Sequence, residues 1–278
     1  MKILDKVYSA DNQAVKYIQQ TMDGYICESM YVDDGRKFVI CFASQLGCAV
    51  GCKMCYNSQA KFYRNLEKPE IIKQCANIVD SEKLQGKDKK ILFSCMGVGE
   101  PLLNYNNVIG AMLELDALYP HNRFAMATTG IRPTLVAKIA DDFVGLDNFK
   151  LTLSLHGSND SLRRSIIPVH ESLETLRGAV EKYKNISKHD YEWNYVLLSG
   201  VNDSEDNALE LVKFLREGEK IKFSTFNEFE GCCLKPSENT DKFISILEEK
   251  GVECERFTPN GRDINGACGQ MAVRFFEI

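Results

Sequence analysis

The sequence predicts an α/β protein in which parallel strand–helix units form a barrel or a partial barrel. Short β-type runs alternate with longer stretches whose apolar residues have helical spacing, such as Leu173, Leu176, Val180 and Tyr183. This alternation is typical of parallel βα units, whose functional residues collect at the C-terminal ends of the strands. A Rossmann-like open sheet is the structural alternative, but no G-x-G-x-x-G follows the first strand to support a dinucleotide site. The six candidate strands are 36–43, 90–95, 123–127, 149–155, 191–198 and 221–226.

The N-terminal residues have a different pattern. Residues 15–19 and 25–32 are predicted to be short strands, with a turn at residues 22–24. We therefore expect two parts. Residues 1–35 form a small N-terminal β extension, and residues 36–278 form the core together with a C-terminal loop.

Length, composition and charge exclude several classes of protein. The chain has 278 residues, of which 44% are hydrophobic and 26% charged, as in one large globular domain or a core with a small appendage. No apolar run approaches the ~18 residues that a membrane span needs, and the N-terminus has no secretory pattern. The net charge of −5 excludes binding of nucleic acid through overall positive charge, although not through a local basic patch. We expect a cytoplasmic monomer with no membrane partner.

Eleven cysteines are unusual in a chain without an export signal. Cys48, Cys52 and Cys55 form C-x3-C-x2-C in a glycine-containing loop directly after the first core strand. A closed structural zinc site needs four ligands, whereas three cysteines on a [4Fe–4S] cluster would leave one iron open to an external ligand. Two alternatives remain: three buried core cysteines, or a zinc site with a distant fourth ligand such as Cys41 or His156.

Sequence blocks on both sides of the cysteine motif narrow the choice. They are C-F-A-S-Q-L-G-C (41–48), R-N-L (64–66), M-G-V-G-E-P-L-L-N (96–104), S-L-H (154–156), Y-V-L-L (195–198), V-N-D (201–203) and D-I-N-G-A-C-G-Q (263–270). In this order and spacing they resemble the RlmN/Cfr family of radical S-adenosylmethionine (SAM) RNA methyltransferases, over about residues 25–271. The resemblance implies a partial (β/α)6 TIM-like barrel and a [4Fe–4S] cluster bound by Cys48, Cys52 and Cys55. It also implies that SAM binds the open iron and that two SAM molecules are used per turnover.

The resemblance also implies three catalytic residues. An adenine ring carbon and the methyl group of SAM are both electrophilic, so a radical route avoids a mismatched polar transfer. In the family scheme, Cys268 first takes a methyl group from SAM as a thiolate nucleophile. Glu28 would remove the ring proton after the methyl carbon has added to the base. Cys41 would then attack the sulfur of Cys268 and release the product by forming a disulfide.

Contacts to SAM are implied at the ends of three strands. Glycine allows close approach of the backbone, and a carboxylate can hold the amino group of SAM. One departure from the family is the A-T-T-G segment at 127–130, where the family has S-T-S-G, so that one hydroxyl is missing. The expected cofactor-binding residues are Gly99, Glu100, Ser154, Leu155, His156 and Asn227.

These features predict a radical SAM methyltransferase that acts on an adenosine ring carbon, C2 rather than C8, in 23S ribosomal RNA, transfer RNA or both. The partners would be the RNA substrate and an electron donor such as flavodoxin or ferredoxin. A related enzyme acting on a small molecule or peptide is one alternative. A non-catalytic iron–sulfur or zinc protein is the other, and the joint presence of Cys41, Glu28 and Cys268 argues against it.

Overall fold

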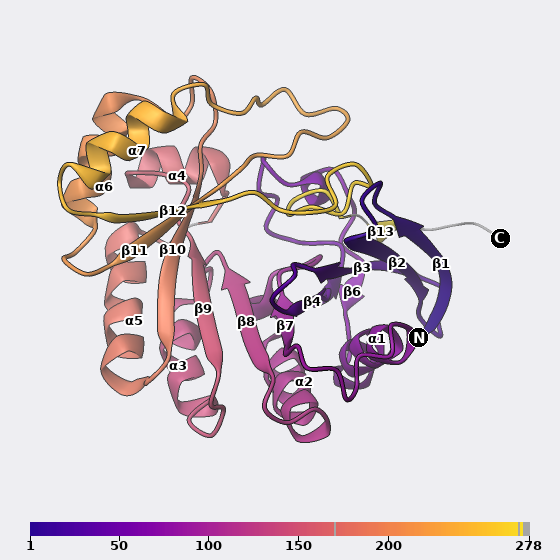
Figure 1. Ribbon diagram of the computed structural model, residues 1–278. Helices are drawn as coiled ribbons and strands as arrows, with labels where there is room; N and C mark the ends of the chain where they lie inside the picture. The colour runs from indigo at the N-terminus through magenta and orange to yellow at the C-terminus, as the bar shows by residue number, and fades with distance from the viewer. Residues whose placement is uncertain (170, 272, 275–278) are drawn as a thin grey trace.

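The computed structural model describes residues 1–169, 171–271 and 273–274. Its centre is one large sheet in which seven neighbouring strands are parallel (Figure 1). All six strands predicted for the core are present, and the predicted α/β class is confirmed. The seventh parallel strand, at the far edge, was not predicted. In sheet order the seven are β4 (Phe38–Cys41), β7 (Ile91–Cys95), β8 (Arg123–Thr128), β9 (Phe149–Ser154), β10 (Asp190–Val196), β11 (Lys220–Ser224) and β12 (Glu253–Phe257).

The N-terminal extension continues this sheet. β1 (Lys2–Tyr8), β2 (Ala14–Gln20) and β3 (Ile26–Asp33) are antiparallel, and β3 pairs antiparallel with β4. The two strands expected from the sequence are β2 and β3, whereas β1 was not predicted. A short separate ladder joins β5 (Gln45–Leu46) to β6 (Arg64–Asn65).

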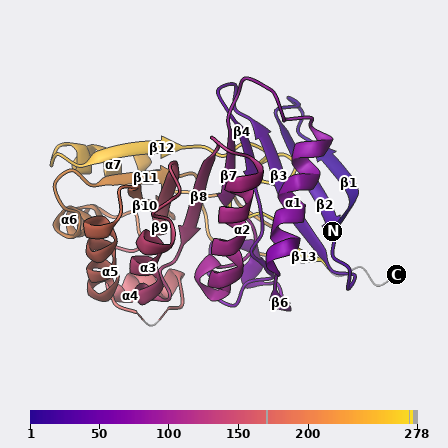
Figure 2. The same cartoon turned by 90° about the horizontal axis from the view of Figure 1, so that it is seen from below.

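Helices cover the outer face of the parallel strands, as Figure 2 shows from below. Apolar spacing places one side of helices such as α2 and α5 on the sheet, and local signals set the helix starts. α1, for example, begins with Pro69 in its first turn and a reciprocal capping pair between Glu67 and Glu70. No helix of the described part of the chain is long and apolar enough to cross a bilayer. The helices are α1 (Lys68–Ser81), α2 (Tyr105–Leu118), α3 (Pro133–Asp142), α4 (Asp160–Ile166), α5 (Leu173–Ile186), α6 (Glu205–Phe214) and α7 (Thr240–Glu248), with 3-10 turns η1 (Tyr56–Ser58) and η2 (Pro101–Asn104).

The C-terminal segment returns across the molecule. After β12 the chain, yellow in Figure 1, crosses to the N-terminal strands, where β13 (Val273–Arg274) pairs with Cys27 and Ile26 of β3. β2 occupies one edge of β3 along its length, so β4 and β13 share the other edge. β3 therefore holds the end of β4 and β13 along the same edge.

Candidate active site at the C-terminal ends of the strands

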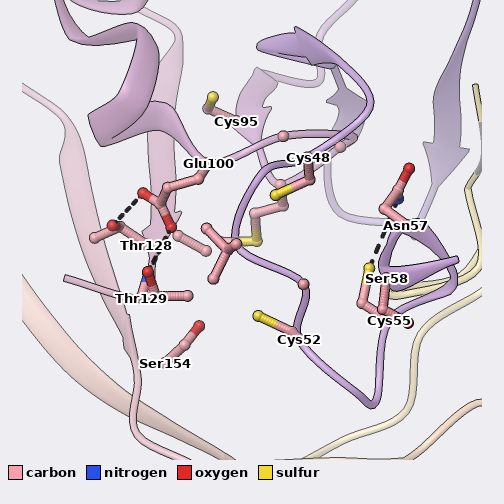
Figure 3. Close-up of a pocket in the computed structure, with 16 residues that line it drawn as sticks. Cys48, Cys52, Cys55, Asn57, Ser58, Cys95, Glu100, Thr128, Thr129 and Ser154 are labelled. Atoms are coloured by element: carbon pink, nitrogen blue, oxygen red, sulfur yellow. Dashed lines mark hydrogen bonds between the residues drawn. The ribbon is translucent and has the colours of Figure 1, made fainter. Parts of the chain in front are cut away.

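The three cysteines of the C-x3-C-x2-C motif line one cavity of about 140 Å³ (Figure 3). The opposite wall comes from the C-terminal ends of β7, β8 and β9 and the turns that follow them. The sequence places the cavity there because parallel strands end at the same edge of a sheet. The cysteine loop after β4 and the barrel strands thus form one site. The residues that face the cysteines include Gly99, Glu100, Thr128, Thr129 and Ser154.

The three thiols are near one another but are not preformed into a metal-binding group. Among the described residues, no three His, Cys, Asp or Glu side chains are arranged to hold a metal ion. Cys55 Sγ instead accepts a hydrogen bond from Asn57 Nδ2 at 3.6 Å (Figure 3). Burial raises the pKa of Cys48 to about 12 and also raises the pKa values of Cys52 and Cys55. They are therefore neutral thiols in this state, and a metal would displace their protons.

The donor set fits an iron–sulfur cluster better than a closed zinc site. The three thiols of the motif share the cavity, and the space beside them is lined by Glu100 and Ser154 rather than by an imidazole. Cys95 also lines the cavity, but it leaves the end of β7 on the opposite wall (Figure 3). Thiolates suit iron–sulfur clusters, and an open position suits a cofactor that binds an external ligand.

Glu100 is a buried carboxylate on the cavity wall, with only 3% of its surface exposed. Burial raises its pKa, although hydrogen bonds from Thr128, Thr129 and the Leu102 amide oppose this effect. The preceding residue, Gly99, has φ +109°, and a Cβ there would lie 2.5 Å from Ser44 Oγ. Only glycine therefore fits this turn. Thr128 and Thr129 were not singled out as partners of Glu100 from the sequence.

The other expected SAM contacts are placed differently. Ser154 lines the cavity, whereas Leu155 and His156 are not among its lining residues. His156 leaves the strand with φ +52°, which ends the side-chain alternation, and its Nδ1 accepts a hydrogen bond from the Val196 amide at 3.0 Å. Burial, with the nearby charge of Arg163, lowers the pKa of His156 to about 3, so the ring is neutral. The ring of His156 therefore links the chain after β9 to the end of β10.

Hydrogen bonds from two sides hold the loop that carries Cys268. Asn227 Nδ2 donates to the Cys268 carbonyl at 3.0 Å, so this asparagine holds the loop. On the other side, the Tyr56 amide donates to the Gly269 carbonyl at 2.8 Å and Asn57 Nδ2 donates to the Met271 carbonyl at 2.9 Å. Hydrogen bonds from the cysteine loop and from the segment after β11 thus meet on this short loop. We name residues 265–271 the carrier loop.

Cys41 and the chain that follows the carrier loop are both attached to β3. Cys41 ends β4 opposite Met30 of β3, and the chain after the carrier loop pairs with Cys27 of the same strand. Burial raises the pKa of Cys41 to about 12, and the Cys268 thiol acts in the same direction. Both are free thiols. Cys268 is exposed to solvent, and desolvation by the neighbouring protein raises the pKa of its thiol.

Glu28 lies between these two attachments. It stands in β3 between the residues that pair with β13 and those that pair with β4, and it is only 6% exposed. Lys16 Nζ of β2 lies 3.5 Å from Glu28 Oε1, and Lys16 is itself buried. This ion pair was not predicted, because nothing in the sequence relates residues on neighbouring antiparallel strands before their register is known.

Three comparisons relate this chain to known proteins. The sequence model of the radical SAM superfamily matches residues 43–212. A probable dual-specificity RNA methyltransferase RlmN of Prochlorococcus marinus (strain NATL1A) is 31% identical over 94% of this chain and 74% of that protein. The protein of the same name from Koribacter versatilis is 31% identical over 96% and 83%, respectively. A crystal structure of a radical SAM methyltransferase from Sphaerobacter thermophilus superimposes with a TM-score of 0.90 at 27% identity, over 97% of this chain and 80% of that one.

Proposed function

Because this chain belongs to the radical SAM superfamily and to its RlmN family of methyltransferases, we propose that it methylates C2 of an adenosine in RNA. The RNA would be 23S ribosomal RNA, transfer RNA or both. The relatives are named as RNA methyltransferases, which supports RNA as the substrate class. The target base would have to be unstacked to reach a cavity at the ends of the strands.

In this proposal Cys48, Cys52 and Cys55 hold a [4Fe–4S] cluster and Glu100 holds the amino group of SAM. When bound, the cluster supplies the electron, delivered by flavodoxin or ferredoxin, that cleaves SAM to a 5′-deoxyadenosyl radical. The position of Glu100 supports this assignment, because it lies across the cavity from the cysteines and its carboxylate is fixed by four hydrogen bonds. Ser154 provides a hydroxyl on the same wall.

Cys268 would carry the methyl group. Its thiol loses a proton, its sulfur forms a bond to the methyl carbon of a first SAM, and the methyl–sulfonium bond of that SAM breaks. A second SAM provides the radical that removes a hydrogen atom from the methyl group, and the resulting carbon radical bonds to the base. The carrier loop suits this role because it exposes Cys268 while hydrogen bonds fix the backbone around it.

Glu28 and Cys41 would complete the reaction. Glu28 would accept the proton from the methylated ring carbon, and the unpaired electron of the adduct would return to the oxidised cluster. The Cys41 thiol would then lose its proton and attack the sulfur of Cys268. The Cys41–Cys268 disulfide forms, the bond from that sulfur to the product carbon breaks, and a proton converts the released methylene group to the methyl group. The observation that carries the proposal is the joint attachment of Cys41, Glu28 and the carrier loop to β3, beside the cavity that the three cluster cysteines line.

A Cys41→Ala variant tests this order of events. Without the second thiol, the bond between Cys268 and the RNA cannot be broken, so we expect a covalent protein–RNA adduct that nuclease digestion and mass spectrometry map to Cys268. Cys254→Ala, which removes a thiol on β12 outside the site, is the matched control and should release methylated RNA normally. Normal turnover by Cys41→Ala would exclude Cys41 as the resolving residue.

A further inference from the structure

Arg163 on α4 is a buried cation without a counter-ion. Only 1% of its surface is exposed, and in the described part of the chain it forms no ion pair with a carboxylate. Its Nη2 donates to the carbonyl of Thr129 at 2.5 Å and to that of Ser154 at 3.3 Å, and its Nε has no hydrogen-bond partner. Removing a guanidinium from water is costly unless an anion compensates it. The structure therefore indicates that an anion is supplied nearby.

The position of Arg163 identifies where that anion would be. Thr129 and Ser154, whose carbonyls accept its hydrogen bonds, line the same cavity as the cluster cysteines. The cysteine loop also docks on α4, since the Lys53 amide donates to the Ile166 carbonyl at 2.9 Å. The arginine thus lies behind the wall that Cys52 faces.

The packing of α4 fixes the position of Arg163 behind this wall. Gly157, in the turn after β9, allows α4 to approach closely, because a Cβ there would lie 2.5 Å from the backbone of Arg163.

We propose that Arg163 is the internal counter-charge of the cluster bound by Cys48, Cys52 and Cys55, and that it raises the reduction potential of that cluster. The proposal rests on the cluster assigned in the proposed function. Binding through three thiolates places negative charge in the cavity, and one-electron reduction adds another negative charge. A buried cation stabilises the reduced state more than the oxidised one, because the low local dielectric strengthens the interaction. Arg163 keeps its proton throughout, and no bond to it forms or breaks.

The test is a redox titration of the anaerobically reconstituted protein without SAM, with dithionite as the reductant and electron paramagnetic resonance as the readout. For Arg163→Met we expect a midpoint potential that is lower by about 59 mV or more, which corresponds to a tenfold less favourable one-electron reduction. Arg163→Lys keeps the charge and should shift the potential much less. Arg164→Met is the matched control, since Arg164 is the next residue of α4 but has a half-exposed side chain beside Asp160. Its potential should equal that of the wild type, because solvent screens the charge.

Each other outcome has a definite meaning. An unchanged potential in Arg163→Met with full iron content overturns the proposal. A normal potential without SAM combined with weaker SAM binding assigns Arg163 to the carboxylate of SAM and also overturns it. If Arg163→Met cannot load iron, the iron content of Arg163→Lys decides. Normal loading of Arg163→Lys supports a role of the positive charge. Equal failure of Arg163→Lys overturns the proposal, because only the guanidinium hydrogen bonds would then matter. A wild-type protein that takes up no cluster would instead refute the cofactor in the proposed function.

Discussion

At the scale of single residues, Glu100 is a buried carboxylate whose orientation is fixed by hydrogen bonds. Four donors point at its two oxygens, and each donor is provided by the backbone or a hydroxyl of a neighbouring turn. Burial raises its pKa because desolvation disfavours the carboxylate, and no positively charged side chain among the described residues forms a salt bridge with it. An incoming ammonium group would supply that charge and gain from the low dielectric of the cavity.

Glu100→Gln should therefore weaken SAM binding. Loss of a hydrogen bond to a charged group costs about 1.5–3 kcal/mol, so we expect about 10- to 150-fold lower affinity in anaerobic equilibrium binding. In the wild type, affinity should fall as the pH decreases through the raised pKa of Glu100, because the neutral acid no longer attracts the ammonium group. The variant should lack this acid-side loss. Equal affinities with equal iron content would show that Glu100 does not contact SAM.

At the scale of elements, β3 organises the site. One of its edges carries both the end of β4, with Cys41, and the strand that follows the carrier loop. Met30 of β3 lies directly beneath that loop, since a Cβ on Gly266 would lie 2.3 Å from Met30 Sδ. The position of Cys268 thus depends on close packing between a glycine and a methionine from distant parts of the sequence.

Gly266→Val should displace the carrier loop. Overpacking of this kind typically costs about 1–3 kcal/mol, and Met30 can move only partly out of the way. We expect less methyl on Cys268 after incubation with SAM, measured by peptide mass spectrometry, with unchanged iron content. Adding Met30→Ala should restore methylation because it opens the space. If the double variant remains as poor as the single one, steric contact with β3 is not what positions the loop.

The elements also show what sequence patterns can and cannot predict. The six core strands are buried and apolar enough to be recognised, whereas β12 reads Glu-Cys-Glu-Arg-Phe and is mostly exposed, so its pattern does not indicate a strand. Two local sequence blocks, C-x3-C-x2-C at 48–55 and M-G-V-G-E-P-L-L-N at 96–104, predict the cavity cysteines and Glu100. The pair Lys16–Glu28 and the turn of His156 away from the cavity depend on register and on one backbone angle. Neither can be obtained from residue types alone.

At the scale of the whole molecule, the buried ion pair between Arg177 and Glu219 stabilises the part of the sheet far from the N-terminal strands. Glu219 accepts from Arg177, from Tyr191 Oη at 2.6 Å and from Trp193 Nε1 at 3.1 Å. Burial alone would raise the pKa of Glu219, but the hydrogen bonds from Arg177 and Tyr191 outweigh it and hold the pKa below its ordinary value. The network joins α5 to β10 and the start of β11.

Glu219→Gln should lower the free energy of unfolding by about 3 kcal/mol at pH 7, because it leaves the Arg177 guanidinium buried without its partner charge. A depressed folded-state pKa contributes stability above the unfolded-state pKa, and that contribution is lost as the pH falls through the folded-state value. The difference in the free energy of unfolding between wild type and variant should accordingly become smaller in acid. Urea unfolding from pH 7 down to the acid limit of the fold measures this difference. A difference independent of pH would point to packing rather than charge.

We infer that Cys268 carries the methyl group beside a cluster held by Cys48, Cys52 and Cys55. The most direct measurement is peptide mass spectrometry of the anaerobically reconstituted protein after incubation with methyl-deuterated SAM and RNA. We predict that the deuterated methyl group appears on Cys268, passes to an adenosine of the RNA, and is found in neither place in Cys268→Ala. Labelled RNA from a protein whose Cys268 is never modified would exclude Cys268 as the carrier of the methyl group.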